Sequence, residues 1–196
     1  MNRRKLVRTA MAAGVLTGAV PFAVAEQLSR TPRDYTGPFY PRGPRNRTND
    51  LIAGQPRTDV LNLAGRVLTP TGSPHAGVVV DIWHADPNGR YKHPRDSGQE
   101  ELLEEFLYWG ESTTNAGGAF TFRTYVPGRY AARPAQHIHY KVWTEDRQPL
   151  LTSQIYFAQL GGAGRYARSD GTTELQTADL LRETDTQLRA TIDIVI

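Results

Sequence analysis

Cysteine is absent from this chain of 196 residues, methionine occurs twice and histidine five times. The absence of cysteine excludes disulfide bonds and thiolate metal ligands, so a metal site would have to use His, Tyr, Asp or Glu. A long apolar run is also absent after residue 25. We therefore expect no stable membrane span in the mature chain.

Residues 1–25 have the pattern of a secretory signal peptide. They contain four basic residues and no acidic residue, and an apolar stretch of 16 residues follows that ends in Ala23-Val24-Ala25. This stretch is shorter than the roughly 20 residues that cross a bilayer, which favours cleavage near Ala25 over a permanent anchor. The pair Arg3-Arg4 indicates export by a twin-arginine route, to the periplasm or out of the cell. An ordinary secretory leader is the alternative.

The excess of positive charge belongs to this leader. The whole chain has 23 Lys and Arg against 20 Asp and Glu. Because the leader holds four of the basic residues and none of the acidic ones, 19 basic and 20 acidic residues remain after cleavage. The mature chain therefore gives no reason to expect nucleic-acid binding.

Beyond the leader, the residue pattern predicts an all-β domain preceded by an extended arm. Residues 26–59 are rich in Pro, Gly, Arg and Asn without a helical period, so we expect an N-terminal arm laid over the domain. From residue 60, apolar residues alternate with polar ones or form β-branched runs between Gly and Pro turns. Short strands without βαβ alternation indicate an antiparallel β-sandwich with long loops over residues 60–196.

Strands are expected over residues 60–67, 77–85, 119–125, 137–143, 151–157 and 190–196. Two other segments have a weaker, helical pattern. Residues 97–108, in which glutamates surround several leucines, predict a short helical excursion, and residues 177–182 predict a brief helix.

The strongest local signal for chemistry is the pair His137 and His139 on a predicted strand. Side chains two residues apart point to the same face of a strand, so both imidazoles would be presented together. Two imidazoles on one face form an edge suited to a transition metal. A pair of surface histidines on an exposed strand is the alternative interpretation of this spacing.

Two tyrosines follow turns that would direct them out of the sheet. Tyr91 follows the turn at residues 86–89, and Tyr130 follows Pro127-Gly128 just before the histidine pair. A single tyrosine after a turn is usually a packing residue. Only the combination with the two histidines favours a metal site.

Several segments, in the same order along the chain, together resemble one known family. They are GPFYP (37–41), GRVL (65–68), DIWHADPNGRY (81–91), TYVPGRY (124–130), RPAQHIH (133–139) and LTSQIYF (151–157). These motifs resemble those of the intradiol ring-cleavage dioxygenases, the protocatechuate 3,4-dioxygenase type in particular. The resemblance extends over roughly residues 36–157.

The resemblance implies a non-haem ferric-iron enzyme that uses dioxygen to cleave a catechol-type ring between its two hydroxyls, giving a muconate-type diacid. It assigns one Fe(III) per chain to Tyr91, Tyr130, His137 and His139. Of these, Tyr130 is implied to leave when substrate binds and Tyr91 to stay. Arg133 and Gln154 are implied to support the substrate, and Tyr40 to line the pocket.

The chain departs from the family pattern at Arg133. Three residues, Pro134, Ala135 and Gln136, separate it from His137, where the family has two. A one-residue bulge would absorb the difference and re-aim Arg133. Without one, its side chain would point elsewhere.

The chemistry of the implied ligands is consistent with iron. A phenol has a pKa near 10, so ionising it at pH 7 costs roughly 4 kcal/mol. Two tyrosinates are therefore reasonable only beside a strong cation, and metal binding should release protons and weaken in acid.

Two other functions stay open at this stage. A non-catalytic β-sandwich binding module would be expected to lack one of the four ligands. A copper-dependent oxidase could use two Tyr and two His in tetragonal geometry. The sequence also leaves open which catechol is the substrate and whether the chain forms a homo-oligomer.

Overall fold

The computed structural model describes residues 27–44, 46–54, 56, 58–130 and 133–196. The predicted leader, residues 1–25, lies outside the described residues, so export stays a prediction. In the described part of the chain, no helix is long and apolar enough to cross a membrane.

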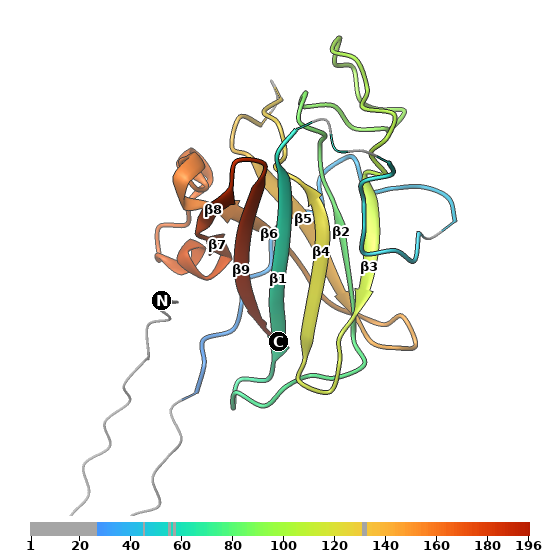
Figure 1. Cartoon of the computed structure of the whole chain (residues 1–196). Coiled ribbons are helices and arrows are strands. Elements are labelled where there is room, and N and C mark those ends of the chain that lie inside the picture. The colour runs from blue at the N-terminus through green and yellow to red at the C-terminus, as the bar shows by residue number, and fades with distance from the viewer. Residues whose placement is uncertain (1–26, 45, 55, 57, 131–132) are drawn as a thin grey trace, which may run out of the picture.

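Within these residues, nine strands form two sheets that lie one behind the other in Figure 1. The four-stranded sheet, in the order β4-β1-β9-β8, consists of β1 (Val60–Leu68), β4 (Ala119–Tyr125), β8 (Leu180–Thr184) and β9 (Gln187–Val195). The five-stranded sheet, in the order β3-β2-β5-β6-β7, consists of β2 (Val79–Trp83), β3 (Trp109–Thr113), β5 (His137–Trp143), β6 (Pro149–Phe157) and β7 (Thr177–Ala178). The short 3-10 helices η1 (Ala158–Leu160), η2 (Gly164–Tyr166) and η3 (Thr172–Gln176) connect β6 to β7.

The predicted β-sandwich is confirmed, with a mixture of pairings that the sequence did not indicate. Most neighbouring strands are antiparallel, but β1 pairs with β9 and β6 pairs with β7 in parallel. The strand β9 comes last in the chain and lies between β1 and β8. The last strand therefore joins the first one in the middle of its sheet.

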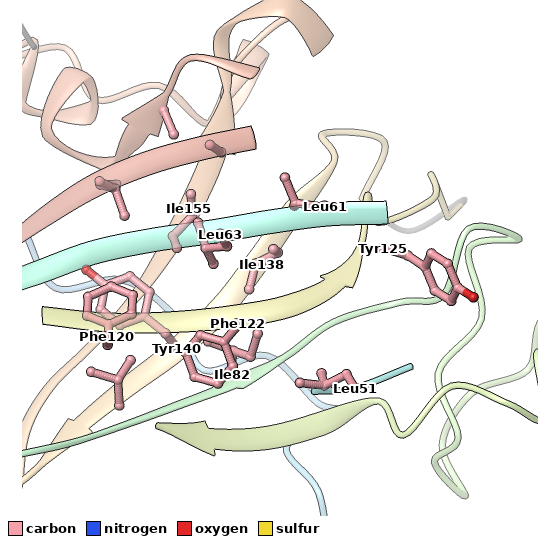
Figure 2. Packing of buried hydrophobic residues seen from close by; sticks show 14 of the residues in the cluster. Leu51, Leu61, Leu63, Ile82, Phe120, Phe122, Tyr125, Ile138, Tyr140 and Ile155 are labelled. Carbon is pink, nitrogen blue, oxygen red and sulfur yellow. The ribbon is translucent and has the colours of Figure 1, made fainter. Parts of the chain in front are cut away.

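The core lies between the two sheets and is built by alternation along the strands. Leu61, Leu63 and Val67 of β1 are buried, while Arg66 between them is exposed. Figure 2 shows residues of both sheets pointing toward one another in this layer, among them Phe120, Phe122, Ile138 and Ile155. Each such side chain contributes roughly 1.5–3 kcal/mol when it is fully buried.

The opposite face of the five-stranded sheet is also covered, and this determines where a site can form. The extended segment of residues 27–44 is fixed by backbone hydrogen bonds, from Thr31 N to Val195 O (3.0 Å) and from Asp34 N to Thr152 O (2.9 Å). A second, aromatic cluster lies on this outer face. It consists of Trp83, Ala85, Tyr91 and Trp109, with Phe39, Tyr40 and Tyr130 packed against it.

Both helix predictions were wrong. Residues 97–108 are irregular apart from a turn at 104–105, because backbone donors serve distant partners: Leu103 N bonds to the Asp86 carboxylate (3.0 Å) and Leu107 N to Leu51 O (2.9 Å). Residues 177–182 fall in β7 and β8. The strand β3 was not predicted. The division into an arm (26–59) and a domain (60–196) stays a prediction.

Candidate metal centre

The two histidines lie at the start of β5, on the covered outer face of the five-stranded sheet. His137 is 2% exposed and His139 1% exposed. Their ring centroids are 4.6 Å apart, and their two Nε2 atoms face each other at 3.1 Å. Trp83, directly opposite His139 on β2, stacks flat on the His139 ring with centroids 5.0 Å apart. The pair is therefore buried and held rigidly, unlike histidines on an exposed strand.

The two tyrosines come from neighbouring loops and meet beside the histidines. The ring of Tyr91 is perpendicular to that of Tyr130, with centroids 5.5 Å apart, and the Tyr130 ring is 6.0 Å from that of His137. The two loops pack closely because Gly128 has no side chain. A Cβ atom at this position would lie 2.4 Å from Gly89 N and from Pro87 O. All four predicted ligands are thus brought together.

Asp86 organises the loop that carries Tyr91. Its side chain is fully buried and accepts hydrogen bonds from the backbone of Asn88 and Arg90 (2.9 Å each) and from the Tyr108 hydroxyl (2.6 Å). Its carbonyl oxygen also accepts a hydrogen bond from Gly128 N (2.9 Å), in the loop that carries Tyr130. One residue thereby fixes both tyrosine loops. The sequence showed it only as the first residue of a turn.

The arm covers the site with Phe39, whereas the hydroxyl of Tyr40 is engaged elsewhere. Phe39 stacks on Tyr91, with centroids 4.5 Å apart, and meets the edge of Tyr130 at 5.9 Å. Tyr40 packs against Trp83, and its hydroxyl donates to the Asp81 carboxylate (2.8 Å). Phe39, rather than Tyr40, therefore contacts the two candidate tyrosine ligands. The resemblance implied Tyr40, the next residue of the GPFYP segment, as the residue that lines the pocket.

A hollow of about 160 Å³ lies beside Tyr91. Its walls are aromatic and aliphatic, and Arg42, Lys92 and His93 line it as well. The complete lining is Phe39, Pro41, Arg42, Tyr91, Lys92, His93, Leu107, Tyr108 and Trp109.

Burial sets the protonation state of the four side chains. It lowers the pKa of His137 to about 4 and the pKa of His139 well below its ordinary value. Burial also raises the pKa of Tyr91 well above 10, with a further contribution from Tyr130, and raises the pKa of Tyr130 itself. At neutral pH both imidazoles are therefore neutral with a free lone pair. The phenols would ionise only beside a strong cation.

The donor atoms fit a metal ion. The Nδ1 atom of His137 lies 2.6 Å from Ala135 O, a carbonyl that can only accept, so Nδ1 carries the proton and the lone pair of Nε2 faces His139. A hydrogen bond of this kind orients an imidazole for metal binding. The Tyr91 hydroxyl and His139 Nδ1 are buried without a hydrogen-bond partner of normal geometry. Among the described residues no group of three or more His, Cys, Asp or Glu could hold a metal, so such a site depends on the tyrosines.

Arg133 and Gln154 lie close to this cluster. Gln154 is directly opposite His139 in the pairing of β5 with β6, and Tyr156 is opposite His137. The Arg133 side chain donates from Nη2 to the Tyr156 hydroxyl (2.5 Å). The longer spacing before His137 is accommodated ahead of the strand, since β5 begins at His137 and Gln136 bonds to Pro127 O (2.7 Å). Tyr156 was not singled out from the sequence, where it is one aromatic residue in a buried strand.

Comparison with known proteins identifies the family to which the chain belongs. The sequence model of the dioxygenase family (Dioxygenase_C) matches residues 35–163. The chain is 34% identical over 116 residues to the protocatechuate 3,4-dioxygenase beta chain of Burkholderia cepacia, covering 56% of this chain and 49% of that one. It is 32% identical over 143 residues to catechol 1,2-dioxygenase 1 of Acinetobacter lwoffii, covering 62% and 45% respectively. The chain thus spans about half the length of the curated relatives it matches.

Among solved structures, the chain is similar to the dioxygenase domain of a dioxygenase and carbohydrate-binding protein fusion from Streptomyces sp. SirexAA-E. The TM-score is 0.67 and the identity 28%, with 86% of this chain and 98% of that one covered. The family match extends over all four candidate ligands, Phe39, Arg133 and Gln154. Fold, motif order and family match agree that the chain belongs to the intradiol ring-cleavage dioxygenases.

Proposed function

We propose that this chain is a ferric-iron dioxygenase that cleaves a catechol-type ring between its two hydroxyls and gives a muconate-type diacid. The observation that carries the proposal is that the rings of Tyr91, Tyr130, His137 and His139 lie next to one another, with Tyr130 half-buried and the other three buried. In this cluster the Tyr91 hydroxyl and His139 Nδ1 have no partner of normal geometry. Two phenols and two neutral imidazoles are a donor set that suits one trivalent ion.

The four side chains would hold one Fe(III) per chain. When bound, the iron would supply a centre that binds both oxygens of a catechol and enables the ring to react with dioxygen. The imidazoles would remain neutral ligands because burial keeps their pKa values low. His137 would keep its orientation through the hydrogen bond to Ala135 O.

The two tyrosines have different roles in this proposal. Tyr91 is 3% exposed, and its ring is held between those of Phe39 and Tyr130. Tyr130 is half-buried, on the loop that follows Gly128. Tyr130 would be the ligand released when substrate binds, and its phenolate oxygen would accept a proton from a substrate hydroxyl. Tyr91 stays in place.

Arg133 would stabilise negative charge that develops on the substrate ring. Its guanidinium is fixed beside Tyr156, across the sheet from His137. Gln154 would support this arrangement from β6. The relatives act, by their names, on catechol and protocatechuate; for this chain we propose the catechol-type class and no single compound.

Oxygen uptake by the iron-loaded mature protein tests the proposal. A panel of substituted catechols should give uptake together with a ring-opened diacid identified by mass spectrometry. Tyr91→Phe should lower the activity by on the order of 100-fold or more, since even partners of metal ligands are worth 10–100-fold. Tyr125→Phe removes a hydroxyl from a buried residue of β4 and is the matched control. Undiminished uptake in Tyr91→Phe would contradict the assignment.

We also propose that the protein is exported and that residues 1–25 are removed. The support is the composition of the leader, with its Arg3-Arg4 pair and the small residues before position 26. The measurement is the N-terminal residue of protein recovered from the periplasm or medium of an expressing bacterium. Recovery of the full-length chain in the cytoplasm alone would refute export.

A further inference from the structure

Arg133 lies outside the named strands: its backbone N bonds to Tyr130 O (3.0 Å), and its side chain is held by two other tyrosines. Three residues that precede β5 separate it from His137, so its long side chain needs other contacts to be ordered. Its Nη2 donates to the Tyr156 hydroxyl at 2.5 Å, and its guanidinium lies over the ring of Tyr166 at 4.5 Å. Arg133 Nε is buried without a hydrogen-bond partner in the described chain. The Nε donor of the guanidinium group is therefore not used by the described residues.

The hydrogen bonds around Tyr156 have a fixed direction. Gln154 donates from Nε2 to the backbone oxygen of Tyr35 (2.8 Å), which fixes the orientation of its amide. Its Oε1 then faces Tyr156 at 2.9 Å and is the nearer of two acceptors for the phenol hydrogen, the other being Asp34 Oδ2 at 3.3 Å. Because a phenol has only one hydrogen, the Tyr156 oxygen is left as an acceptor toward Arg133. The order of donors is Arg133 to Tyr156 to Gln154 to the arm backbone.

The arm also adds a negative charge next to this series. The Asp34 carboxylate lies 3.3 Å from the Tyr156 hydroxyl and accepts a hydrogen bond from Gln176 (3.1 Å). Gln176 in turn donates to Ser153 of β6 (2.9 Å). Asp34 is therefore held in place by Gln176 of η3. Its negative charge favours the cationic guanidinium of Arg133 on the other side of the Tyr156 hydroxyl.

We propose that Tyr156 is a positioning residue that holds Arg133 in the orientation needed beside the metal centre. Gln154 acts through Tyr156, since its amide is engaged by Tyr156 and by the arm. Tyr166 stabilises the flat face of the same guanidinium by a cation–π contact. The consequence for catalysis rests on the proposed function, whereas the anchoring of Arg133 does not.

The anchoring is tested in metal-free protein by labelling arginines with phenylglyoxal and measuring each site by peptide mass spectrometry. In Tyr156→Phe, the labelling rate of Arg133 should rise about tenfold relative to that of Arg95, an exposed arginine in the same sample. Tyr125→Phe should leave the ratio unchanged. Gln154→Leu, which removes the nearer acceptor of the Tyr156 hydrogen and leaves Asp34, should raise the ratio by a smaller factor. An unchanged ratio in both Tyr156→Phe and Gln154→Leu overturns the proposal.

A double-mutant cycle in iron-loaded protein tests the consequence for catalysis. Tyr156→Phe should lower kcat/KM by about tenfold in the wild-type background and should have no further effect in Arg133→Lys. Equal effects in both backgrounds would mean that Tyr156 does not act through Arg133. If no catechol is turned over at all, the proposed function fails, while the labelling result still decides the anchoring.

Discussion

Asp86 illustrates how a single side chain outside the candidate ligand set determines where the ligands lie. Its carboxylate accepts three backbone hydrogen bonds, from Asn88, Arg90 and Leu103, and one from the Tyr108 hydroxyl. These contacts are made in a fully buried position. Hydrogen bonds to a buried charged group are worth more than neutral ones, and loss of the charge leaves several donors unsatisfied.

Asp86→Asn is therefore expected to lower the free energy of unfolding by about 3 kcal/mol, because the amide nitrogen would face N–H or O–H donors. The same change should weaken metal binding, since the loops of Tyr91 and Tyr130 both depend on Asp86. Chemical denaturation and a metal titration measure the two effects. Asp146→Asn, which alters an exposed carboxylate between β5 and β6, is the control. Equal stability of the two variants would contradict the role given to Asp86.

Sequence motifs pointed to the four candidate ligands, but they did not reveal the residues that act on the site through tertiary contacts. The histidine pair could be placed on one face because the strand period requires it. The adjacency of Tyr91 and Tyr130 came from the resemblance alone, since it depends on the packing of two loops. Phe39 and Tyr156 could not be assigned, because nothing in their local sequence distinguishes them from core residues.

The arm is the element that turns an outer sheet face into an enclosed site. At Gly37 it passes so close to His139 that a Cβ atom would lie 3.1 Å from Cε1 and 3.2 Å from Nε2 of the imidazole. Gly37 also has a φ of 74°, a region that disfavours residues with a side chain. The arm thus depends on a glycine where it crosses the histidine pair.

Gly37→Ala should lower stability by about 1–2 kcal/mol through backbone strain. It should also reduce metal affinity about tenfold by displacing His139. Gly72→Ala, with a similar φ of 83° and only Leu28 Cδ1 nearby at 3.9 Å, isolates the strain. Thermal unfolding and a metal titration of both variants separate the two contributions. A loss of affinity in Gly72→Ala as large as in Gly37→Ala would rule out the contact with His139 as the cause.

Strands with clear alternation of apolar and polar residues could be predicted from the sequence. Segments whose conformation depends on hydrogen bonds to distant residues could not. β1, β2, β4, β5, β6 and β9 overlap the segments expected to be strands. Residues 97–108 have helix-forming composition, yet Asp86 and Leu51 take up the backbone donors of Leu103 and Leu107. The parallel pairing of β1 with β9 joins residues more than 100 positions apart and leaves no local signal.

The buried side chain of His84 makes the stability of the whole protein depend on pH. It is completely buried, with Nδ1 2.7 Å from Ala85 O and Nε2 2.7 Å from the Thr124 hydroxyl. Burial lowers its pKa in the folded state to about 4, below the ordinary 6.5. The unfolded state therefore takes up the proton first as the pH falls. The stabilising contribution of neutral His84 is present above pH 6.5 and is lost progressively between about 6.5 and 4.

We predict that the unfolding free energy of metal-free protein decreases as the pH is lowered from 7 to 4, with His84 contributing on the order of 3 kcal/mol. Denaturation at a series of pH values measures this decrease. His84→Gln should show a shallower dependence than the wild type over the same range. An identical pH dependence in both proteins would exclude His84 as a source.

The central claim is that Tyr91, Tyr130, His137 and His139 hold a single ferric ion. Metal analysis of the purified mature protein, combined with its visible absorption spectrum, tests this most directly. We predict about one iron per chain and a tyrosinate-to-iron charge-transfer band that is lost in Tyr91→Phe and kept in Tyr125→Phe. Copper in place of iron, the absence of any bound metal after iron loading, or an unchanged band in Tyr91→Phe would contradict the account.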